Sequence, residues 1–368
     1  MAILQDKFWE RMKSQETDRT RCLAAVQGRY DGYDMEEFEH QGYCSYTLLL
    51  TPRKMYGSIE KDYRITDSTY PSQLIVQLRP GQHALDLTLC WEAQKRHPTL
   101  VPTIRALDLY LPGLIAYQME KLGGTPLSRL QHHGPSPGVK LQQKQETLIA
   151  SFAKTIARSW PEASNRKRRD STLYPVLPMA IRQAFLLPCT GKVGSCILQK
   201  LGKLAKGLPD EWLRMRAQLT LDKICMLDDY PIVLNHGDLI PSNILADEDT
   251  WEITGLVDWE EAEYLPFGTC LYGLEHLLGF LQSSALELGG PLWTYYDSAA
   301  QLRELFWTTL LGLVPALDSM KDDVRLMRDV GVFLWHGYAW DEGAIDRVVD
   351  EVNDSEELAK LRAFLSVS

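Results

Sequence analysis

The chain has 368 residues, enough to bury a large core, and at roughly 150 residues per domain it predicts two domains or one domain with two lobes. Its net charge of −10 argues against a nucleic-acid-binding protein, because neutralising phosphates requires a clustered excess of Lys and Arg. The seven cysteines form no CxxC pair, which argues against a disulfide framework or a zinc site.

The N-terminal residues 1–28 predict a charged, helical lead-in. They lack the apolar core of a secretory signal, and no stretch of the chain approaches the ~18 apolar residues that a membrane span needs. We therefore expect a cytoplasmic protein that has no membrane partner.

The following segments predict a small antiparallel sheet. FEHQGYCSYTLLL (38–50) has a glycine between two strand-like runs, and QLIVQLRP (73–80) is a β-rich run that ends in proline. Residues 84–97 have the spacing of an amphipathic helix. LIAYQMEKL (114–122) returns to strand character before the breaker GGTP (123–126), so we expect a boundary between two lobes here.

The rest of the chain is mostly helical in pattern. The expected helices cover residues 140–160, 174–188, 208–227, 269–284, 298–320 and 323–340. Strand character interrupts them only in PIVLNHGDLIPSNIL (231–245) and WEITGLVDWEEAEYLPFG (251–268). The acidic residues of interest lie in these two interruptions.

The two interruptions supply residue types that phosphoryl transfer requires. Such a site needs positioned metal ions and a carboxylate that orients or deprotonates the attacking hydroxyl. A loop can direct Asp238 and Asn243 into one site, and a hairpin of two short strands then brings Asp258 beside Asn243. Because Mg²⁺ prefers oxygen ligands, these three side chains predict a magnesium-dependent site.

The same residues carry a family resemblance. HGDLIPSN (236–243) resembles the catalytic loop HGDxxxxN of the aminoglycoside phosphotransferase and choline kinase family, and LVDWE (256–260) resembles that family's metal-binding segment. The chain further resembles fungal members of the family in GYCSYTLLL, IVQLRP and YLPFGTCLYGLEHLLG.

The resemblance implies an α+β, protein-kinase-like fold. An N-terminal lobe, residues 1–122, would hold the helical lead-in, a nucleotide-covering sheet and a hinge strand, and a helical C-terminal lobe, residues 123–368, would hold the catalytic and metal-binding loops. The implied activity is transfer of phosphate from ATP, with Mg²⁺, to a hydroxyl of a small molecule.

The resemblance also assigns roles in the C-terminal lobe. Asp238 matches the catalytic carboxylate, and Asn243 and Asp258 match the magnesium ligands. His236 belongs to the catalytic loop, where we expect it to brace the loop through hydrogen bonds. Glu260 can approach a second metal or the substrate, or it can be a solvated surface acid.

The N-terminal lobe departs from the family pattern. The strand position that normally holds a phosphate-binding Lys is Gln77, and an amide cannot replace that charge. Arg79 shares a strand face with Gln77, so it can serve the phosphates or merely end an edge strand. The acid on the following helix is Asp86 by spacing or Glu92 by residue type.

Two further segments match nucleotide-binding positions. Gly42 to Ser45 take the place of the phosphate-covering loop, although a plain hairpin turn fits equally well, and Met119 to Leu122 match the hinge that meets adenine. GKVGS (191–195) mimics a Walker motif but lacks a Ser or Thr directly after the Lys, so we reject it.

Two alternatives to a kinase remain. Gln77 favours a pseudokinase that binds nucleotide without transfer, and a repurposed fold would use the site without ATP. The site for the acceptor is expected within residues 269–345.

Overall fold

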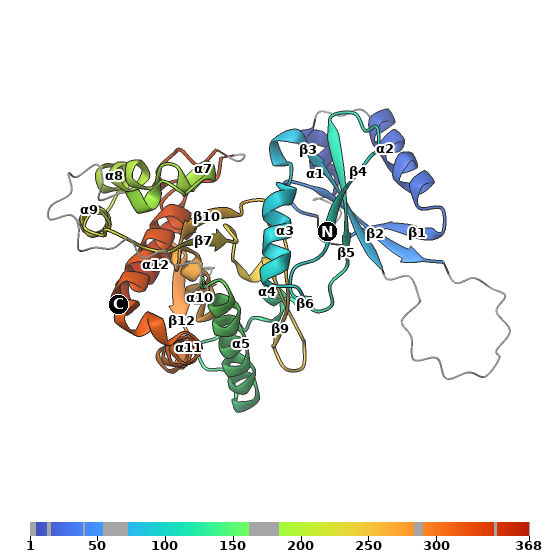
Figure 1. The fold of residues 1–368 in the computed structure, drawn as a ribbon. Helices are drawn as coiled ribbons and strands as arrows, with labels where there is room; N and C mark the ends of the chain where they lie inside the picture. The colour runs from blue at the N-terminus through green and yellow to red at the C-terminus, as the bar shows by residue number, and fades with distance from the viewer. Residues whose placement is uncertain are drawn as a thin grey trace. The chain divides into compact units, whose positions relative to one another are not determined.

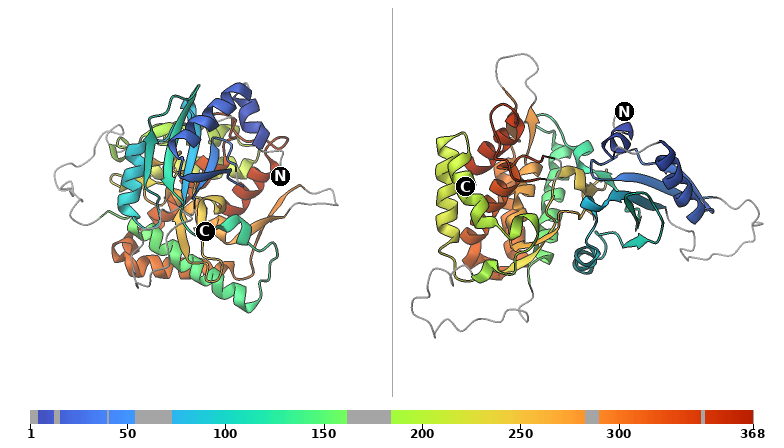
Figure 2. Two further views of the ribbon diagram at one scale, coloured as in Figure 1. Left: turned by 90° about the vertical axis from the view of Figure 1, so that its right-hand side faces the viewer. Right: turned by 90° about the horizontal axis from the view of Figure 1, so that it is seen from above.

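The computed structural model describes residues 5–12, 16–39, 41–53, 73–161, 184–282, 290–341 and 344–367. The chain forms two compact units, Met1–Leu122 and Gly123–Ser368 (Figures 1 and 2). None of the described helices is both long and apolar enough to cross a membrane.

The first unit is built around a five-stranded antiparallel sheet with the strand order β1-β2-β3-β5-β4 (Figure 1). Its elements are α1 (Gln5–Arg11), α2 (Glu16–Arg29), β1 (Tyr33–Glu37), β2 (Tyr46–Pro52), β3 (Leu74–Pro80), η1 (Gly81–His83), α3 (Leu87–Arg96), β4 (Ile104–Leu107) and β5 (Leu114–Glu120). The antiparallel sheet and the helical lead-in agree with the expectation from the sequence. The described residues of 38–45, however, form no strand, and β1 and β4 were not predicted.

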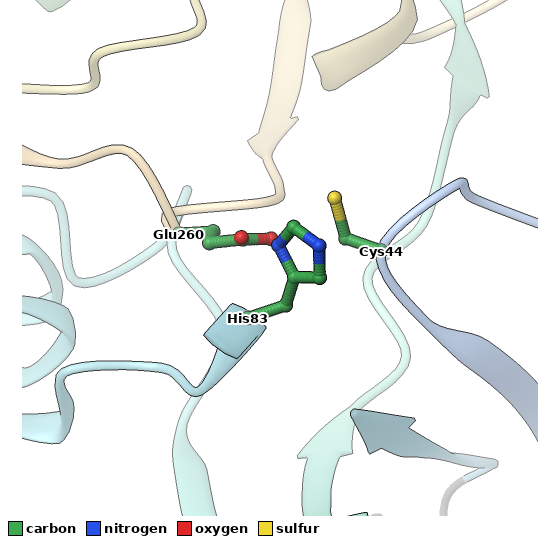
Figure 3. A group of neighbouring side chains, drawn as sticks. All are labelled: Cys44, His83 and Glu260. Atoms are coloured by element: carbon green, nitrogen blue, oxygen red, sulfur yellow. The ribbon is translucent and has the colours of Figure 1, made fainter. Parts of the chain in front are cut away.

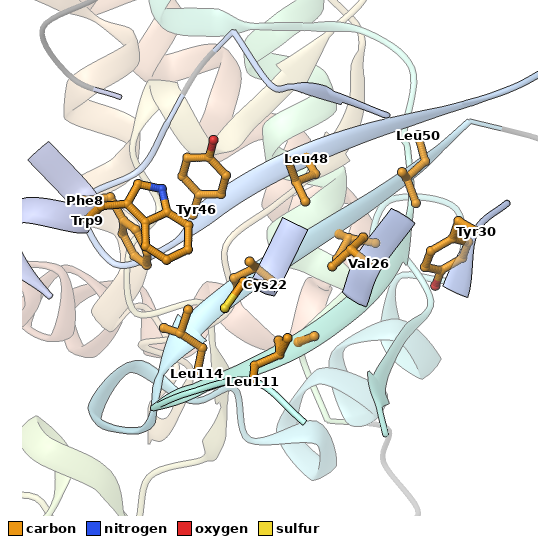
Figure 4. Packing of buried hydrophobic residues seen from close by; sticks show 13 residues of the cluster. Phe8, Trp9, Cys22, Val26, Tyr30, Tyr46, Leu48, Leu50, Leu111 and Leu114 are labelled. Carbon is orange, nitrogen blue, oxygen red and sulfur yellow. The ribbon is translucent and has the colours of Figure 1, made fainter. Parts of the chain in front are cut away.

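The core of this unit lies between the lead-in helices and one face of the sheet. In β2 the alternate residues Tyr46, Leu48 and Leu50 are buried, because side chains two apart share a strand face. Cys22 and Val26 of α2 lie one helical turn apart and belong to the same core cluster, which Figure 4 shows close up. The lead-in is thus part of the folded unit.

In its described residues, the second unit combines helices with three small antiparallel sheets. Its helical elements are α4 (Leu127–Leu130), α5 (Val139–Arg158), η4 (Ala184–Leu186), α7 (Gly191–Gly194), α8 (Ile197–Gly207), α9 (Glu211–Ile224), η5 (Pro241–Asn243), η6 (Thr269–Leu271), α10 (Tyr272–Leu277), α11 (Ala299–Leu313), η7 (Pro315–Met320), α12 (Lys321–His336) and α13 (Ser355–Ser366). Its strands are β6 (Thr125–Pro126), β7 (Ile232–Asn235), β8 (Ile244–Ala246), β9 (Ile253–Leu256), β10 (Glu263–Pro266), β11 (Gly279–Gln282) and β12 (Leu292–Tyr295). Among these, β8 pairs with β9, as the predicted hairpin requires, and β7 pairs with β10.

A buried ion network holds α10 in place. Glu275 of α10, which is fully buried, accepts hydrogen bonds from Arg303 of α11 (2.8 Å) and Arg328 of α12 (3.0 Å). Arg328 also donates to the carbonyl of Val367 (2.8 Å), after α13. Separating these helices would leave a buried charge without its partner, which is energetically costly. The network therefore holds α10 against α11 and α12, and Arg328 extends it to the end of α13.

The structure corrects the expectation of one continuous helix over residues 269–284. This segment contains η6, α10 and then the strand β11, which pairs with β12. A Cβ atom at Gly279 would lie 2.4 Å from the carbonyl oxygen of Thr294, so the glycine permits the close approach of the two strands. A short apolar run such as LLGFL fits a buried strand as well as a helix, and its pairing partner decides.

Other predicted helices differ in extent from those in the structure. Of the helix expected at 174–188, residues 174–183 lie outside the described part of the chain, and 184–186 form the short turn η4. The helices α8 and α13 were not predicted.

Candidate active site

The candidate catalytic loop begins at the end of β7, where Asn235 fixes its first residues. The Nδ2 of the buried Asn235 donates to the carbonyl of Leu265 (3.2 Å), and its Oδ1 accepts from the backbone N–H of Cys270 (3.2 Å). One side chain therefore joins the loop to β10 and to η6.

Gly237 allows the loop to pass close to a second chain segment. Its φ of 79° lies in the left-handed region, and a Cβ atom there would lie 1.7 Å from the carbonyl oxygen of Glu261. Any other residue would displace the loop from the segment that follows Asp258.

His236 connects the catalytic loop to the second motif. Its Nε2 bonds the carbonyl of Val257 (2.9 Å), and its Nδ1 accepts from the N–H of Asp238 (3.3 Å). Burial lowers the pKa of this imidazole to about 4, so the ring is neutral and offers the one donor and one acceptor that these partners require. The hydrogen bonds fit the bracing role that we expected of His236.

Asp238 has one carboxylate oxygen fixed and one without a partner. Oδ2 accepts from Nδ2 of Asn243 (2.8 Å), whereas Oδ1 is buried and receives no hydrogen bond from the described residues. Burial, followed by the negative charge of Asp258, raises the pKa of Asp238 to about 7. A buried carboxylate oxygen without a partner is the acceptor that an incoming hydroxyl group needs.

Asn243 and Asp258 lie at adjoining ends of the β8–β9 hairpin. Ile244 pairs with Leu256, and the N–H of Val257 donates to the carbonyl of Asn243 (3.0 Å). Asp258 is exposed and has a φ of 64°, a conformation that Asp tolerates better than most residues. The structure thus brings Asp238, Asn243 and Asp258 together, as the motif spacing predicts.

These side chains fit a magnesium ion. The NH₂ group of Asn243 is used by Asp238, which leaves its amide oxygen for another partner, and Asp258 offers an exposed carboxylate. Carboxylate and amide oxygens are the ligands that Mg²⁺ prefers. The charge of Asp258 also contributes to the raised pKa of Asp238, which a bound cation would counteract.

The Walker-like segment 191–195 binds a carboxylate of the protein itself. The N–H groups of Val193 and Gly194 donate to the carboxylate of Glu263 (3.0 and 2.7 Å). Lys192 forms an ion pair with Glu261 (3.0 Å). These backbone amides are therefore already occupied, in keeping with the rejection of a nucleotide-binding loop here.

Gln77 and Arg79, in the first unit, lie on the same face of β3. Nε of Arg79 donates to Oε1 of Gln77 (3.0 Å), and Arg79 is only 1% exposed. Because β3 is the central strand, paired with β2 and β5, the alternative that Arg79 ends an edge strand is wrong. A buried guanidinium on a central strand requires stronger stabilisation than a surface cation.

The two candidate helix acids make different contacts. Asp86 is the N-cap of α3, where its Oδ1 accepts from the N–H of Thr88 (2.9 Å) and of Leu89 (3.3 Å). Glu92 forms an ion pair with Lys95 (2.8 Å) at the surface of the same helix. Asp86 therefore caps the N-terminus of α3, a role that Glu92 does not have.

The segment from Gly42 to Ser45 joins β1 to β2. Ser45, directly before β2, is buried, with its hydroxyl 3.5 Å from that of Thr47. The Cys44 thiol lies beside the ring of His83, with potential ligand atoms within 4.8 Å (Figure 3). Glu260, also drawn there, belongs to the other unit, and two side chains of one unit are too few to identify a metal centre.

The hinge candidates lie at the end of the first unit. Met119 is a buried residue of β5 that pairs with Ile75 and Ile104. Leu122 is the last residue of this unit and is half-buried.

One residue near the catalytic loop was missed by the sequence analysis. Tyr272, the first residue of α10, donates a hydrogen bond to the carbonyl of Gly237 and accepts one from the N–H of Leu239, each at 2.9 Å. The sequence offers no signal for this contact, because an aromatic residue in the apolar run CLYGLEHLLG resembles ordinary core.

Two solved structures with TM-scores above 0.5 confirm the protein-kinase-like fold. The chain is similar to the GDP complex of wild-type aminoglycoside 2'-phosphotransferase-IIIa, with 16% identity over 94% of this chain and 98% of that chain and a TM-score of 0.52. It is also similar to a mutant of that enzyme with GDP, with 14% identity over 94% and 97% of the two chains and a TM-score of 0.53. A choline kinase from Cryptosporidium parvum has 12% identity over 94% of each chain and a TM-score of 0.47.

Sequence comparison identifies the family. No curated protein matches the chain. The phosphotransferase enzyme family (APH) matches residues 62–269, a range that contains the catalytic loop and the hairpin ending at Asp258. Since the match covers more than half of the chain and includes the residues assembled around Asp238, the protein belongs to this phosphotransferase family.

Proposed function

We propose that the protein transfers the terminal phosphate of ATP to a hydroxyl group of a small molecule, with Mg²⁺. The observation that carries the proposal is the asymmetric environment of Asp238. One oxygen is fixed by Asn243, and the other is buried without a partner among the described residues. This arrangement suits a general base that receives the proton of an acceptor hydroxyl.

In this proposal each residue has a defined part. Asp238 orients the hydroxyl and accepts its proton, and His236 keeps the loop in place as a neutral ring. Asn243 and Asp258 would hold Mg²⁺, which neutralises charge on the phosphate oxygens.

Arg79, paired with Gln77, is the candidate cation for the nucleotide phosphates. Gly42, Ser45, Met119 and Leu122 are candidates for nucleotide contacts.

The second candidate is a nucleotide-binding protein without transfer. It is favoured by Gln77, which stands where kinase-like sites carry a Lys. The two candidates differ in turnover rather than in nucleotide affinity, so a change that affects only the chemical step separates them.

The test is Asp238→Asn, measured with Mg²⁺, ATP or GTP and a panel of hydroxyl compounds. We expect nucleotide affinity to stay nearly unchanged and turnover to fall by about 10² to 10⁴, the range of a general base. The control is Asp249→Asn, an exposed carboxylate in the turn between β8 and β9. Transfer by the wild-type protein that Asp238→Asn leaves intact would refute the assignment, and nucleotide binding without transfer would favour the second candidate.

A further inference from the structure

Two peptide planes flank Asp238 and set the direction of its side chain. They present four polar backbone groups, namely Gly237 C=O, Asp238 N–H, Asp238 C=O and Leu239 N–H. Asp238 N–H donates to His236 (3.3 Å), and Asp238 C=O accepts from Asn243 Nδ2 and from Ile240 N–H, each at 3.0 Å. These contacts come from within the loop.

The remaining two groups are bound by one hydroxyl from outside the loop. Tyr272 Oη donates to Gly237 C=O and accepts from Leu239 N–H, each at 2.9 Å. A phenolic hydroxyl can do both, because it is a donor and an acceptor. Leu239 is 2% exposed and Tyr272 is 3% exposed, so water has little access to replace this hydroxyl.

Tyr272 is itself held on several sides. Its ring stacks on Trp335 of α12, with centroids 5.0 Å apart and planes 6° apart. A Cβ atom at the adjacent Gly273 would lie 2.5 Å from the carbonyl oxygen of Leu239, so α10 packs directly on the loop. The ion network around Glu275 fixes the same helix. The hydroxyl therefore has a defined position relative to the loop.

We propose that Tyr272 is a positioning residue that aims the carboxylate of Asp238 by fixing one polar group in each of its two flanking peptide planes. The part it plays in turnover rests on the proposed function. Tyr272 does not need to touch the substrate. It acts through the backbone on both sides of Asp238, which distinguishes it from His236, whose ring binds only the Asp238 N–H within these planes.

The first arm of the test measures kinetics of Tyr272→Phe, which keeps the ring and removes the hydroxyl. We expect kcat to fall about 10- to 100-fold, because a misplacement of about 1 Å in a catalytic group has effects of this size. The KM for nucleotide should stay within about twofold, since the nucleotide makes no use of this hydroxyl.

The matched control is Tyr230→Phe. Tyr230 is also 3% exposed, and its hydroxyl donates to a backbone carbonyl, that of Phe267 (2.9 Å), which lies outside the catalytic loop. Tyr272→Phe loses two buried hydrogen bonds and Tyr230→Phe loses one, so both should melt at a lower temperature, but only Tyr272→Phe should lose kcat. In an Asp238→Asn background, Tyr272→Phe should reduce the residual rate no further, because the carboxylate that it positions is already absent.

The second arm measures hydrogen exchange of the Leu239 amide and needs no turnover. We expect exchange in Tyr272→Phe to be roughly five- to tenfold faster than in the wild type, as for the loss of one buried hydrogen bond. Unchanged exchange would overturn the proposal, as would an equal loss of kcat in both Phe variants. If the wild-type protein transfers no phosphate, the proposed function fails, while the exchange result still decides whether Tyr272 holds the loop.

Discussion

Replacing Asp238 by Asn should stabilise the protein at neutral and alkaline pH while it abolishes most of the turnover. The carboxylate is held beside Asp258 in a buried setting that raises its pKa to about 7. The substitution removes the charge and keeps an oxygen that can accept from Asn243 Nδ2, which now bonds Oδ2 at 2.8 Å. Stability and activity should therefore change in opposite directions.

The size of the expected gain in stability follows from the raised pKa of Asp238. The difference between the ordinary value of 3.8 and about 7 is about three pKa units, which at 1.36 kcal/mol per unit sets an upper bound of ~4 kcal/mol. Oδ1 is buried, but the Asp238 residue as a whole is only half-buried, so solvent screening reduces the expected gain to about 1–3 kcal/mol.

The size of the stability difference between variant and wild type depends on pH, and its sign does not change. Below pH 4 the carboxyl group is protonated in folded and unfolded chains alike, so the difference between wild type and variant is small. Between pH 4 and 7 the unfolded chain releases a proton that the folded chain retains, and the wild type loses stability relative to the variant as the pH rises. Above pH 7 the difference is constant. His236 keeps its lowered pKa in both proteins, so its effect cancels.

The assay is urea unfolding of both proteins at several values between pH 4 and 8, with a chelator present. Addition of Mg²⁺ should reduce the difference in the free energy of unfolding, because a cation beside Asp258 stabilises the ionised carboxylate of the wild type. A difference that does not change with pH, or a wild type that is more stable than the variant at pH 8, would refute the reasoning.

Two further predictions concern the metal and the nucleotide phosphates. Asp258→Ala should abolish the Mg²⁺-dependent part of nucleotide binding and leave the far-ultraviolet circular dichroism unchanged, and Mg²⁺-dependent binding that persists in the folded variant would exclude Asp258 as a ligand. Arg79→Ala should weaken nucleotide binding at least tenfold, about 1.4 kcal/mol, and Gln77→Ala much less. Because Arg79 is almost fully buried, the melting temperature of the Arg79→Ala variant is measured alongside its nucleotide binding. The reverse order of effects on binding would exclude Arg79 as the phosphate cation.

Much of the first unit could be predicted because its signals are local. The strand QLIVQLRP ends at Pro80, and the helix that follows has an acidic N-cap in Asp86 and basic residues in its last turn. The segment 269–284 could not be predicted in the same way. Its apolar residues fit either secondary structure, and the choice depends on β12, beyond the reach of a local pattern.

The residues of the candidate site divide in the same way. Local motifs predict some of them, and the others depend on packing between distant segments. Asp238 and Asn243 are five residues apart, and the β8–β9 hairpin brings Asp258 to Asn243 through pairing within one short segment. Spacing along the chain therefore determines their proximity. The contact of Tyr272 with Gly237 and Leu239 joins residues more than 30 positions apart and depends on the packing of α10 and on the stack with Trp335.

Such a contact leaves no local sequence pattern, because the polar groups that it satisfies belong to the backbone, which is alike in every residue. A side chain that binds a substrate must have a particular chemistry, and a motif can therefore reveal it. A side chain that binds a peptide group needs only a hydroxyl at the right place, so Tyr272 looks like any other aromatic residue of an apolar helix. Residues that position a catalytic group are for this reason found by accounting for each backbone N–H and C=O of the loop, and here two of the four groups flanking Asp238 lead to the same hydroxyl.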